Sequence, residues 1–232
     1  MPVQLIQRKP YPNVNALAEG FATYAAEVLS AALTRQETVS LVVPGGSTPR
    51  IYLPALAAKE LPWQRIAITL SDERWVDVEL PDSNECLVRT CLLDHLNVQP
   101  RFAGLKTLHD IPEAAIPDIC QRLEALPQPF TLTVLGLGED GHIASLFPGL
   151  KLHETQQKIV RQCIVVAPPV APSLRVSLSL EALAESEQIV LVVTGKNKRQ
   201  LLDKIENHAD STLPIVWLLE RVQSPVVVFE TD

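Results

Sequence analysis

Apolar and polar residues along this chain follow two patterns, one typical of helices and one of buried strands. Apolar side chains recur at helical spacing within residues 13–34, at Leu17, Phe21, Ala25, Val28 and Leu29. Short apolar runs bounded by polar or Gly-rich segments predict strands at 38–43, 65–70, 131–137, 163–169, 174–180, 187–195, 213–219 and 224–230. Further helices are predicted over 49–58, 84–96, 110–126 and 196–207.

Strands that alternate with helices predict an α/β fold with a mostly parallel sheet covered by helices on both faces. We see no repeat and no linker, so we expect residues 1–232 to form one doubly wound, Rossmann-like domain. In such sheets ligands bind beyond the carboxyl ends of the strands. Three polar segments follow predicted strands, at 44–50, 71–84 and 136–149, the first and last of them containing glycines, and we expect them at one edge of the sheet.

Composition narrows the class of protein. The 20 Lys and Arg residues against 27 Asp and Glu residues, without a basic stripe, argue against a nucleic-acid partner. No apolar run reaches the roughly 18 residues of a membrane span, and the N-terminus has no long apolar segment typical of a signal peptide. The four cysteines lack a CxxC or zinc spacing, so we expect reduced thiols, no metal and a cytoplasmic protein. The oligomeric state stays open between a monomer and a weak dimer.

The segment Pro44–Arg50, PGGSTPR, joins a predicted strand to a predicted helix. Gly45, Gly46, Ser47 and Thr48 could present backbone N–H groups and hydroxyls to a phosphate. The alternative is a tight turn in which Ser47 or Thr48 caps the helix and Pro49 occupies its first turn. The segment is not a Walker A loop, because GK[ST] does not follow.

The segment Gly136–Gly149, GLGEDGHIASLFPG, formally contains the dinucleotide fingerprint G-x-G-x-x-G. We reject a dinucleotide site, because the motif lies in mid-chain and Pro148 leaves only a short segment after it. Asp140 and His142 are two residues apart and could point to the same side of an extended loop. A carboxylate fixes the tautomer of a neighbouring imidazole, and histidine suits general-base chemistry near neutral pH. An exposed histidine without a role is the alternative.

Charged residues elsewhere could bind an anionic substrate. Asp72 and Arg74 follow a predicted strand within SDERW, and Arg175 lies early in another. Lys198 belongs to a run of cations at a helix start, where a bound anion would relieve repulsion from the helix dipole. A solvated charge run is the alternative for each. A G-x-S-x-G elbow does not occur, which disfavours a serine hydrolase.

Together these segments resemble the 6-phosphogluconolactonase family. VVPGGSTPRIY, SDERWVDVELPDSNECLV, LGLGEDGHIASLFPG, RVSLSLEAL and TGKNKRQLL occur in the family's order, over about residues 14–218. The third of these segments is the most specific. One departure is Asp77, where many relatives have proline, and we place no functional weight on it.

The resemblance implies a sugar-phosphate lactonase without metal or nucleotide cofactor, acting in the oxidative pentose phosphate pathway. Its substrate would be 6-phosphogluconolactone, with the phosphate held by the GGSTP loop, Arg175 and Lys198. His142 matches the family's general base, with Asp140 in support. Backbone N–H groups or Arg74 could stabilise the oxyanion, and Asp72 could bind sugar hydroxyls.

Two other functions are considered. Glucosamine-6-phosphate deaminases resemble this chain in fold, but their DGHIAFNEP pattern places a carboxylate five residues after the histidine, where this chain has Phe147. Their DEY is also DERW here. A non-catalytic sugar-phosphate sensor is the second alternative, and the intact Asp140–His142 pair argues against it.

Overall fold

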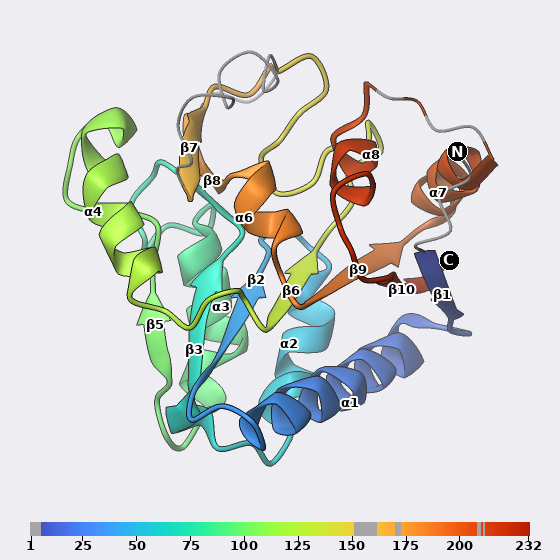
Figure 1. Cartoon of the computed structure of the whole chain (residues 1–232), viewed down its shortest axis with the longest axis horizontal. Coiled ribbons are helices and arrows are strands. Elements are labelled where there is room, and N and C mark those ends of the chain that lie inside the picture. The colour runs from blue at the N-terminus through green and yellow to red at the C-terminus, as the bar shows by residue number, and fades with distance from the viewer. Residues whose placement is uncertain (1–5, 151–161, 170–172, 208–209, 211) are drawn as a thin grey trace.

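The computed structural model describes residues 6–150, 162–169, 173–207, 210 and 212–232. Within these residues a seven-stranded sheet forms the centre of the molecule (Figure 1). The strand order is β1-β10-β9-β6-β2-β3-β5, and every neighbouring pair is parallel. The bounds are β1 Ile6–Pro10, β2 Val39–Val43, β3 Ile66–Leu70, β5 Arg101–Ala103, β6 Leu132–Leu135, β9 Gln188–Thr194 and β10 Val226–Thr231. The predicted parallel α/β fold is confirmed.

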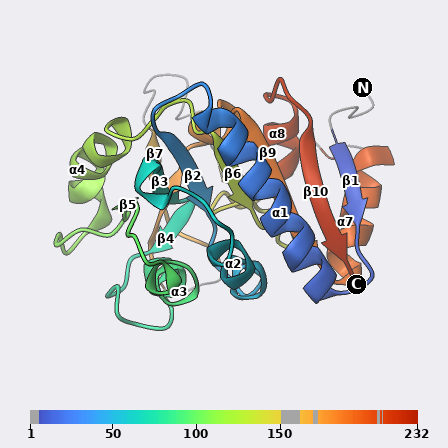
Figure 2. The same ribbon diagram turned by 90° about the horizontal axis from the view of Figure 1, so that it is seen from below.

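The central strands are buried on both faces, which explains their continuous apolar sequences. Every residue of β2 and β3 is buried. Helices cover the sheet on both sides, as Figure 2 shows with α1, α2 and α3 in front and α7 and α8 behind. The bounds are α1 Val14–Leu33, α2 Pro49–Ala57, α3 Asn84–Cys91, α4 Pro112–Glu124, α6 Leu180–Ala184, α7 Lys196–Asn207 and α8 Pro214–Leu219. None of the helices in the described part of the chain has the length and apolar character to cross a bilayer.

A second, three-stranded antiparallel sheet was not predicted. Its strands are β4 Asp72–Arg74, β8 Arg175–Leu178 and β7 Cys163–Val166, in the order β4-β8-β7. The predicted strands near 163–169 and 174–180 therefore lie outside the main sheet, and the polar segment 71–84 begins as a strand. Ser71 connects the two sheets, because its N–H donates to the carbonyl of Val43 in β2 and its carbonyl accepts from the N–H of Leu178 in β8.

The prediction of a strand at 213–219 was wrong, because residues 214–219 form α8. All six residues of α8 are buried, so the apolar run has no periodicity that distinguishes a helix from a strand. Pro214 occupies the first helical turn, a position that suits proline. The N–H of Ile215 donates to the carbonyl of Gly141 at 3.2 Å instead of entering a sheet.

The two edge strands, β1 and β5, were not predicted either. β1 has the polar sequence IQRKP and only partial burial, and it pairs with β10 along its whole length. β5 has three residues and pairs with β3. Edge strands are short and often polar, so their hydrophobic pattern is weak.

Candidate active site

A cleft of about 360 Å³ lies at the carboxyl ends of the central strands. The chain progresses from β2 through β3 to β5 on one side and from β6 through β9 to β10 on the other. The direction of winding therefore reverses between β2 and β6, which is where ligands bind in open parallel sheets. The loops after these two strands line the cleft, as the sequence predicted.

Nine of the ten predicted site residues line this cleft: Gly45, Gly46, Ser47, Thr48, Asp72, Arg74, His142, Arg175 and Lys198. Asp140 lies outside this set and contacts His142. The fold thus brings together residues from five segments of the sequence. Their individual roles remain predictions.

The loop after β2 is shaped by two glycines. Gly46 has a φ of +97°, a conformation that glycine adopts without strain. A Cβ at Gly45 would lie 1.8 Å from Oδ1 of Asn84, so a side chain there would collide with this buried amide. Thr48 precedes α2 but makes no capping hydrogen bond. Its Oγ1 lies 3.3 Å from Oγ1 of Thr194, which ties the loop to the end of β9.

The carboxylate of Asp140 holds the imidazole of His142. Oδ1 of Asp140 lies 2.6 Å from Nδ1 of His142 and also accepts the backbone N–H of His142 at 3.2 Å. A proton on Nδ1 that is directed to Asp140 leaves the lone pair of Nε2 available as a base. A Cβ at Gly138 would lie 2.2 Å from Nδ1, so glycine is needed for this packing.

Two apolar side chains, Leu213 and Phe147, pack around His142 and its loop of residues 136–149, which we call the histidine loop. Gly141 has a φ of +84°, and a Cβ there would approach the side chain of Leu213, just before α8, to 3.0 Å. Phe147 is buried, and its ring centre lies 4.8 Å from that of His142. The guanidinium carbon of Arg175 lies 5.8 Å from the same Phe147 ring. Phe147 therefore packs between the histidine and the arginine and is not among the residues that line the cleft.

Asp72 connects the segment after β3 to the histidine loop. Its Oδ2 accepts a hydrogen bond of 2.6 Å from Oγ of Ser145 and lies 3.8 Å from Nη1 of Arg175. Burial lowers the pKa of Arg175, and the charge of Asp72 opposes this effect. Ser145 was not predicted as a site residue, although its place in the DGHIAS segment was a signal.

Glu73 belongs to the same SDERW segment, and its side chain is fully buried. Its carboxylate accepts hydrogen bonds from the N–H groups of Arg74, Asn84 and Glu85, each at 2.7 Å, and from Oγ of Ser83 at 3.0 Å. Burial is the largest influence on this group and raises its pKa, against the effect of these bonds. Glu73 thereby joins β4 to the first turn of α3.

Asn84 is a further residue that the sequence analysis missed. It is buried, lines the cleft and donates from Nδ2 to the carbonyl of Asp72 at 2.8 Å. Arg74 also reaches the cleft, and its Nη1 donates to the carbonyl of Asp82 at 2.5 Å. These bonds fix the loop between β4 and α3 beside the cleft.

The cations at the start of α7 have different surroundings. Lys198 is half-buried and lines the cleft, whereas Arg199 pairs with carboxylates of the chain itself. Nδ2 of Asn197 donates to Oε1 of Glu139 at 3.3 Å, which links α7 to the histidine loop. Among the described residues, no group of three or more His, Cys, Asp or Glu side chains is arranged to hold a metal ion.

Comparison with known proteins shows the family of this chain. The model of the family glucosamine-6-phosphate isomerases/6-phosphogluconolactonase matches residues 12–227. The chain is 34% identical to a 6-phosphogluconolactonase of Rhizobium meliloti over 94% of this chain and 96% of that protein. A crystal structure of a 6-phosphogluconolactonase from Shewanella baltica superposes with a TM-score of 0.94 at 33% identity, over all of both chains. This chain therefore belongs to the glucosamine-6-phosphate isomerase/6-phosphogluconolactonase family.

Proposed function

We propose that this protein hydrolyses 6-phosphoglucono-1,5-lactone to 6-phosphogluconate. The observation that carries the proposal is the Asp140–His142 pair at a cleft that Arg175 and Lys198 also line. One base and one cation-lined anion site are what hydrolysis of a phosphorylated lactone requires. The relatives from Rhizobium meliloti and Shewanella baltica bear the name of this activity.

In this mechanism His142 acts as the general base. Nε2 takes a proton from a water molecule as the water oxygen attacks the lactone carbonyl carbon. The bond between that carbon and the ring oxygen then breaks, and the proton passes from His142 to the ring oxygen, which becomes the C5 hydroxyl. Asp140 holds the imidazole and stabilises its charged form. No covalent intermediate is needed, because a lactone already reacts slowly with water.

The remaining groups bind the substrate. Arg175 and Lys198, with the loop of residues 45–48, hold the phosphate and so position the ring at the base. Arg74 or backbone N–H groups of the Gly-rich loops stabilise the oxyanion. Asp72 accepts hydrogen bonds from sugar hydroxyls, and its bonds to Ser145 and Arg175 hold it in place.

The surroundings of His142 favour the lactonase over the deaminase. Deamination of an amino-sugar phosphate moves protons between two carbons and needs acid–base groups beyond one histidine and one aspartate. Phe147 stands where deaminases place a carboxylate, and its ring packs against His142. An aromatic ring neither gives nor takes a proton there, while lactone hydrolysis loses nothing by this change.

We further propose that the enzyme acts in the cytoplasm, in the oxidative pentose phosphate pathway, and that the chain forms a single catalytic domain. The pairing of β1 with β10 supports one domain, because it joins residues 6–10 to residues 226–231 in the same sheet.

A direct assay of two substrates tests the function. We expect the purified protein to accelerate opening of 6-phosphogluconolactone above the buffer rate and to release no ammonia from glucosamine-6-phosphate. Ammonia release without lactone opening would show that the protein is a deaminase and that the lactonase proposal is wrong. Binding of 6-phosphogluconate without turnover of either substrate would indicate the non-catalytic sensor.

A further inference from the structure

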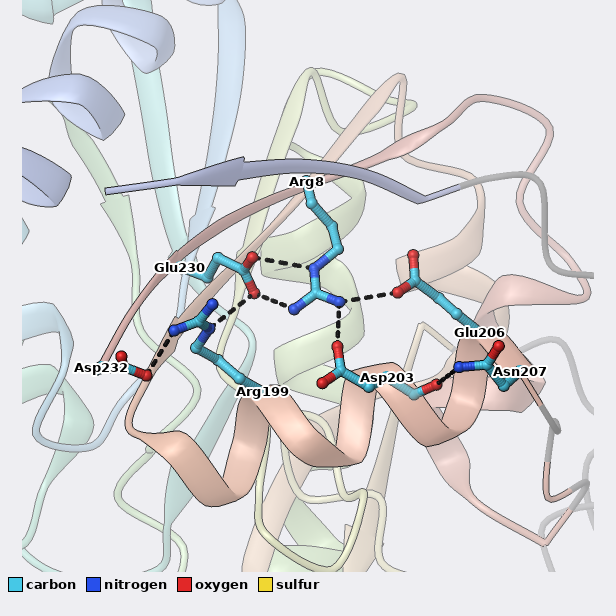
Figure 3. Close-up of polar contacts among 7 residues, drawn as sticks. All are labelled: Arg8, Arg199, Asp203, Glu206, Asn207, Glu230 and Asp232. Carbon is cyan, nitrogen blue, oxygen red and sulfur yellow. Dashed lines mark hydrogen bonds and ion pairs between the residues drawn. The ribbon is translucent and has the colours of Figure 1, made fainter. Parts of the chain in front are cut away.

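A cluster of charged side chains joins three elements of the fold, β1, β10 and α7 (Figure 3). Arg8 of β1 donates to both carboxylate oxygens of Glu230 in β10, at 3.0 and 2.5 Å. Nη1 of Arg8 also binds Asp203 and Glu206 of α7, at 2.5 and 2.9 Å. Because Glu230 is only 3% exposed, the bidentate pair with Arg8 is shielded from water and is held in one geometry.

Arg199 connects this cluster to the first turn of α7. Its Nε lies 3.5 Å from Oε2 of Glu230, and its Nη1 lies 2.5 Å from Oδ1 of Asp232. The carboxylate of Glu230 therefore lies between the guanidinium groups of Arg8 and Arg199, as Figure 3 shows. Arg199 directly follows Lys198, which lines the cleft, whereas Arg199 is not among the residues that line it.

Helix α7 buries few of its own side chains. All of its residues are described, and of these only Leu202 and Ile205 are buried. Its first turn carries Lys196, Lys198 and Arg199, three cations at the positive end of the helix dipole, which disfavours them. The carboxylates of Glu230 and Asp232 offset this repulsion at Arg199.

We propose that Arg199 is a positioning residue for the substrate phosphate, acting through Lys198. By binding Glu230, which Arg8 holds on the sheet, Arg199 fixes the first turn of α7 and directs the Lys198 ammonium into the cleft. The inference rests on the proposed function, because it assigns the phosphate to Lys198.

A double-mutant cycle tests whether Arg199 acts through Lys198. We expect Arg199→Met, which keeps the aliphatic stem, to raise KM for 6-phosphogluconolactone roughly 10-fold and to leave kcat within about twofold. In the Lys198→Met background the same substitution is expected to have almost no further effect. Arg199→Lys should recover part of the loss. Unphosphorylated gluconolactone should react equally with the wild type and Arg199→Met.

Lys204→Met is the matched control, since Lys204 is an exposed cation further along the same helix. It removes one positive charge without touching Glu230, so it measures the general attraction of the substrate anion. We expect its KM to stay within about twofold of the wild type. An equal rise in KM for Lys204→Met and Arg199→Met would show that Arg199 acts only through its long-range positive charge, and it would overturn the proposal.

Calorimetric binding of 6-phosphogluconate to the same variants separates this inference from the proposed function, because it needs no turnover. If wild type binds this ligand and the effects of Arg199→Met and Lys198→Met are additive, the positioning role alone is wrong. Equal losses on phosphorylated and unphosphorylated lactones would also overturn it, as general damage to the fold. If wild type neither binds 6-phosphogluconate nor opens the lactone, the function and the inference are both wrong.

Discussion

At the scale of single residues, glycines in the two loops make room for functional side chains. A Cβ at Gly138 would meet Nδ1 of His142, and one at Gly45 would meet the amide of Asn84. Positive φ angles at Gly46 and Gly141 then give each loop its turn. The loops are Gly-rich because the backbone lies against these side chains, and we propose phosphate binding as a further role of the first loop.

Replacing His142 by alanine tests the base. The substitution removes the proton acceptor but leaves the phosphate site intact, so kcat should fall by roughly 10²–10⁴ while KM changes little. Steady-state kinetics with 6-phosphogluconolactone, corrected for the buffer reaction, give both values. His95→Ala is the control, because His95 is exposed and does not line the cleft. Turnover of a folded His142→Ala variant at the wild-type rate would remove His142 from the mechanism.

At the scale of elements, the start of α3 is held by two side chains. Ser83 caps the helix, because its Oγ accepts the N–H of Cys86. Glu73 adds acceptors for the N–H groups of Asn84 and Glu85, which lie at the same helix end. A carboxylate here also interacts favourably with the helix dipole. The hydrogen bonds to Glu73 were not predicted, because a loop of nine residues separates β4 from α3 along the chain and the sequence does not show that the two meet.

Glu73→Gln should destabilise the fold. The amide nitrogen of glutamine would face donors in place of an acceptor oxygen, and hydrogen bonds to a charged group contribute about 1.5–3 kcal/mol. We expect a loss in the free energy of unfolding of about that size, measured by chemical denaturation. Glu79→Gln is the matched control, since Glu79 is an exposed carboxylate of the same loop. If both variants unfold at the same denaturant concentration, the buried bonds of Glu73 contribute nothing net.

At the scale of the whole molecule, the cleft is assembled from both sheets. Arg175 comes from β8 of the antiparallel sheet, whereas Lys198 comes from α7 after β9 of the parallel sheet. The hydrogen bond from Ser145 to Asp72 joins the loop that carries His142 to the antiparallel sheet. The hydrogen bond from Asn197 to Glu139 joins α7 to the same loop. A phosphate between Arg175 and Lys198 would therefore add a link between the two sheets.

Arg175→Ala and Lys198→Ala test this phosphate site. Each removes a charge-assisted hydrogen bond worth about 1.5–3 kcal/mol, so kcat/KM for the phosphorylated lactone should fall by about 10–150-fold. The rate with unphosphorylated gluconolactone should be low in the wild type and nearly unchanged in both variants. A parallel loss on the two lactones would point to a general disturbance of the cleft and against a phosphate contact.

The sequence by itself determined the α/β class, most of the buried strands, and the loops at the carboxyl edge of the sheet. These features depend on local properties: apolar runs for β2 and β3, helical spacing for α1, and glycines where the backbone must turn. The pairing of Asp140 with His142 was also predictable, because two residues of spacing already bring the side chains together.

Only the tertiary structure decided which distant segments meet. α8 was misread as a strand, because a run buried on all sides has no periodicity. The buried carboxylates of Glu73 and Glu230 were not recognised, since a charged residue reads as exposed unless its partners are known. Those partners are the N–H groups of a helix start for Glu73, and Arg8 and Arg199 for Glu230. The physical reason is that hydrophobic pattern depends on neighbours along the chain, whereas the environment of a charge depends on neighbours in space.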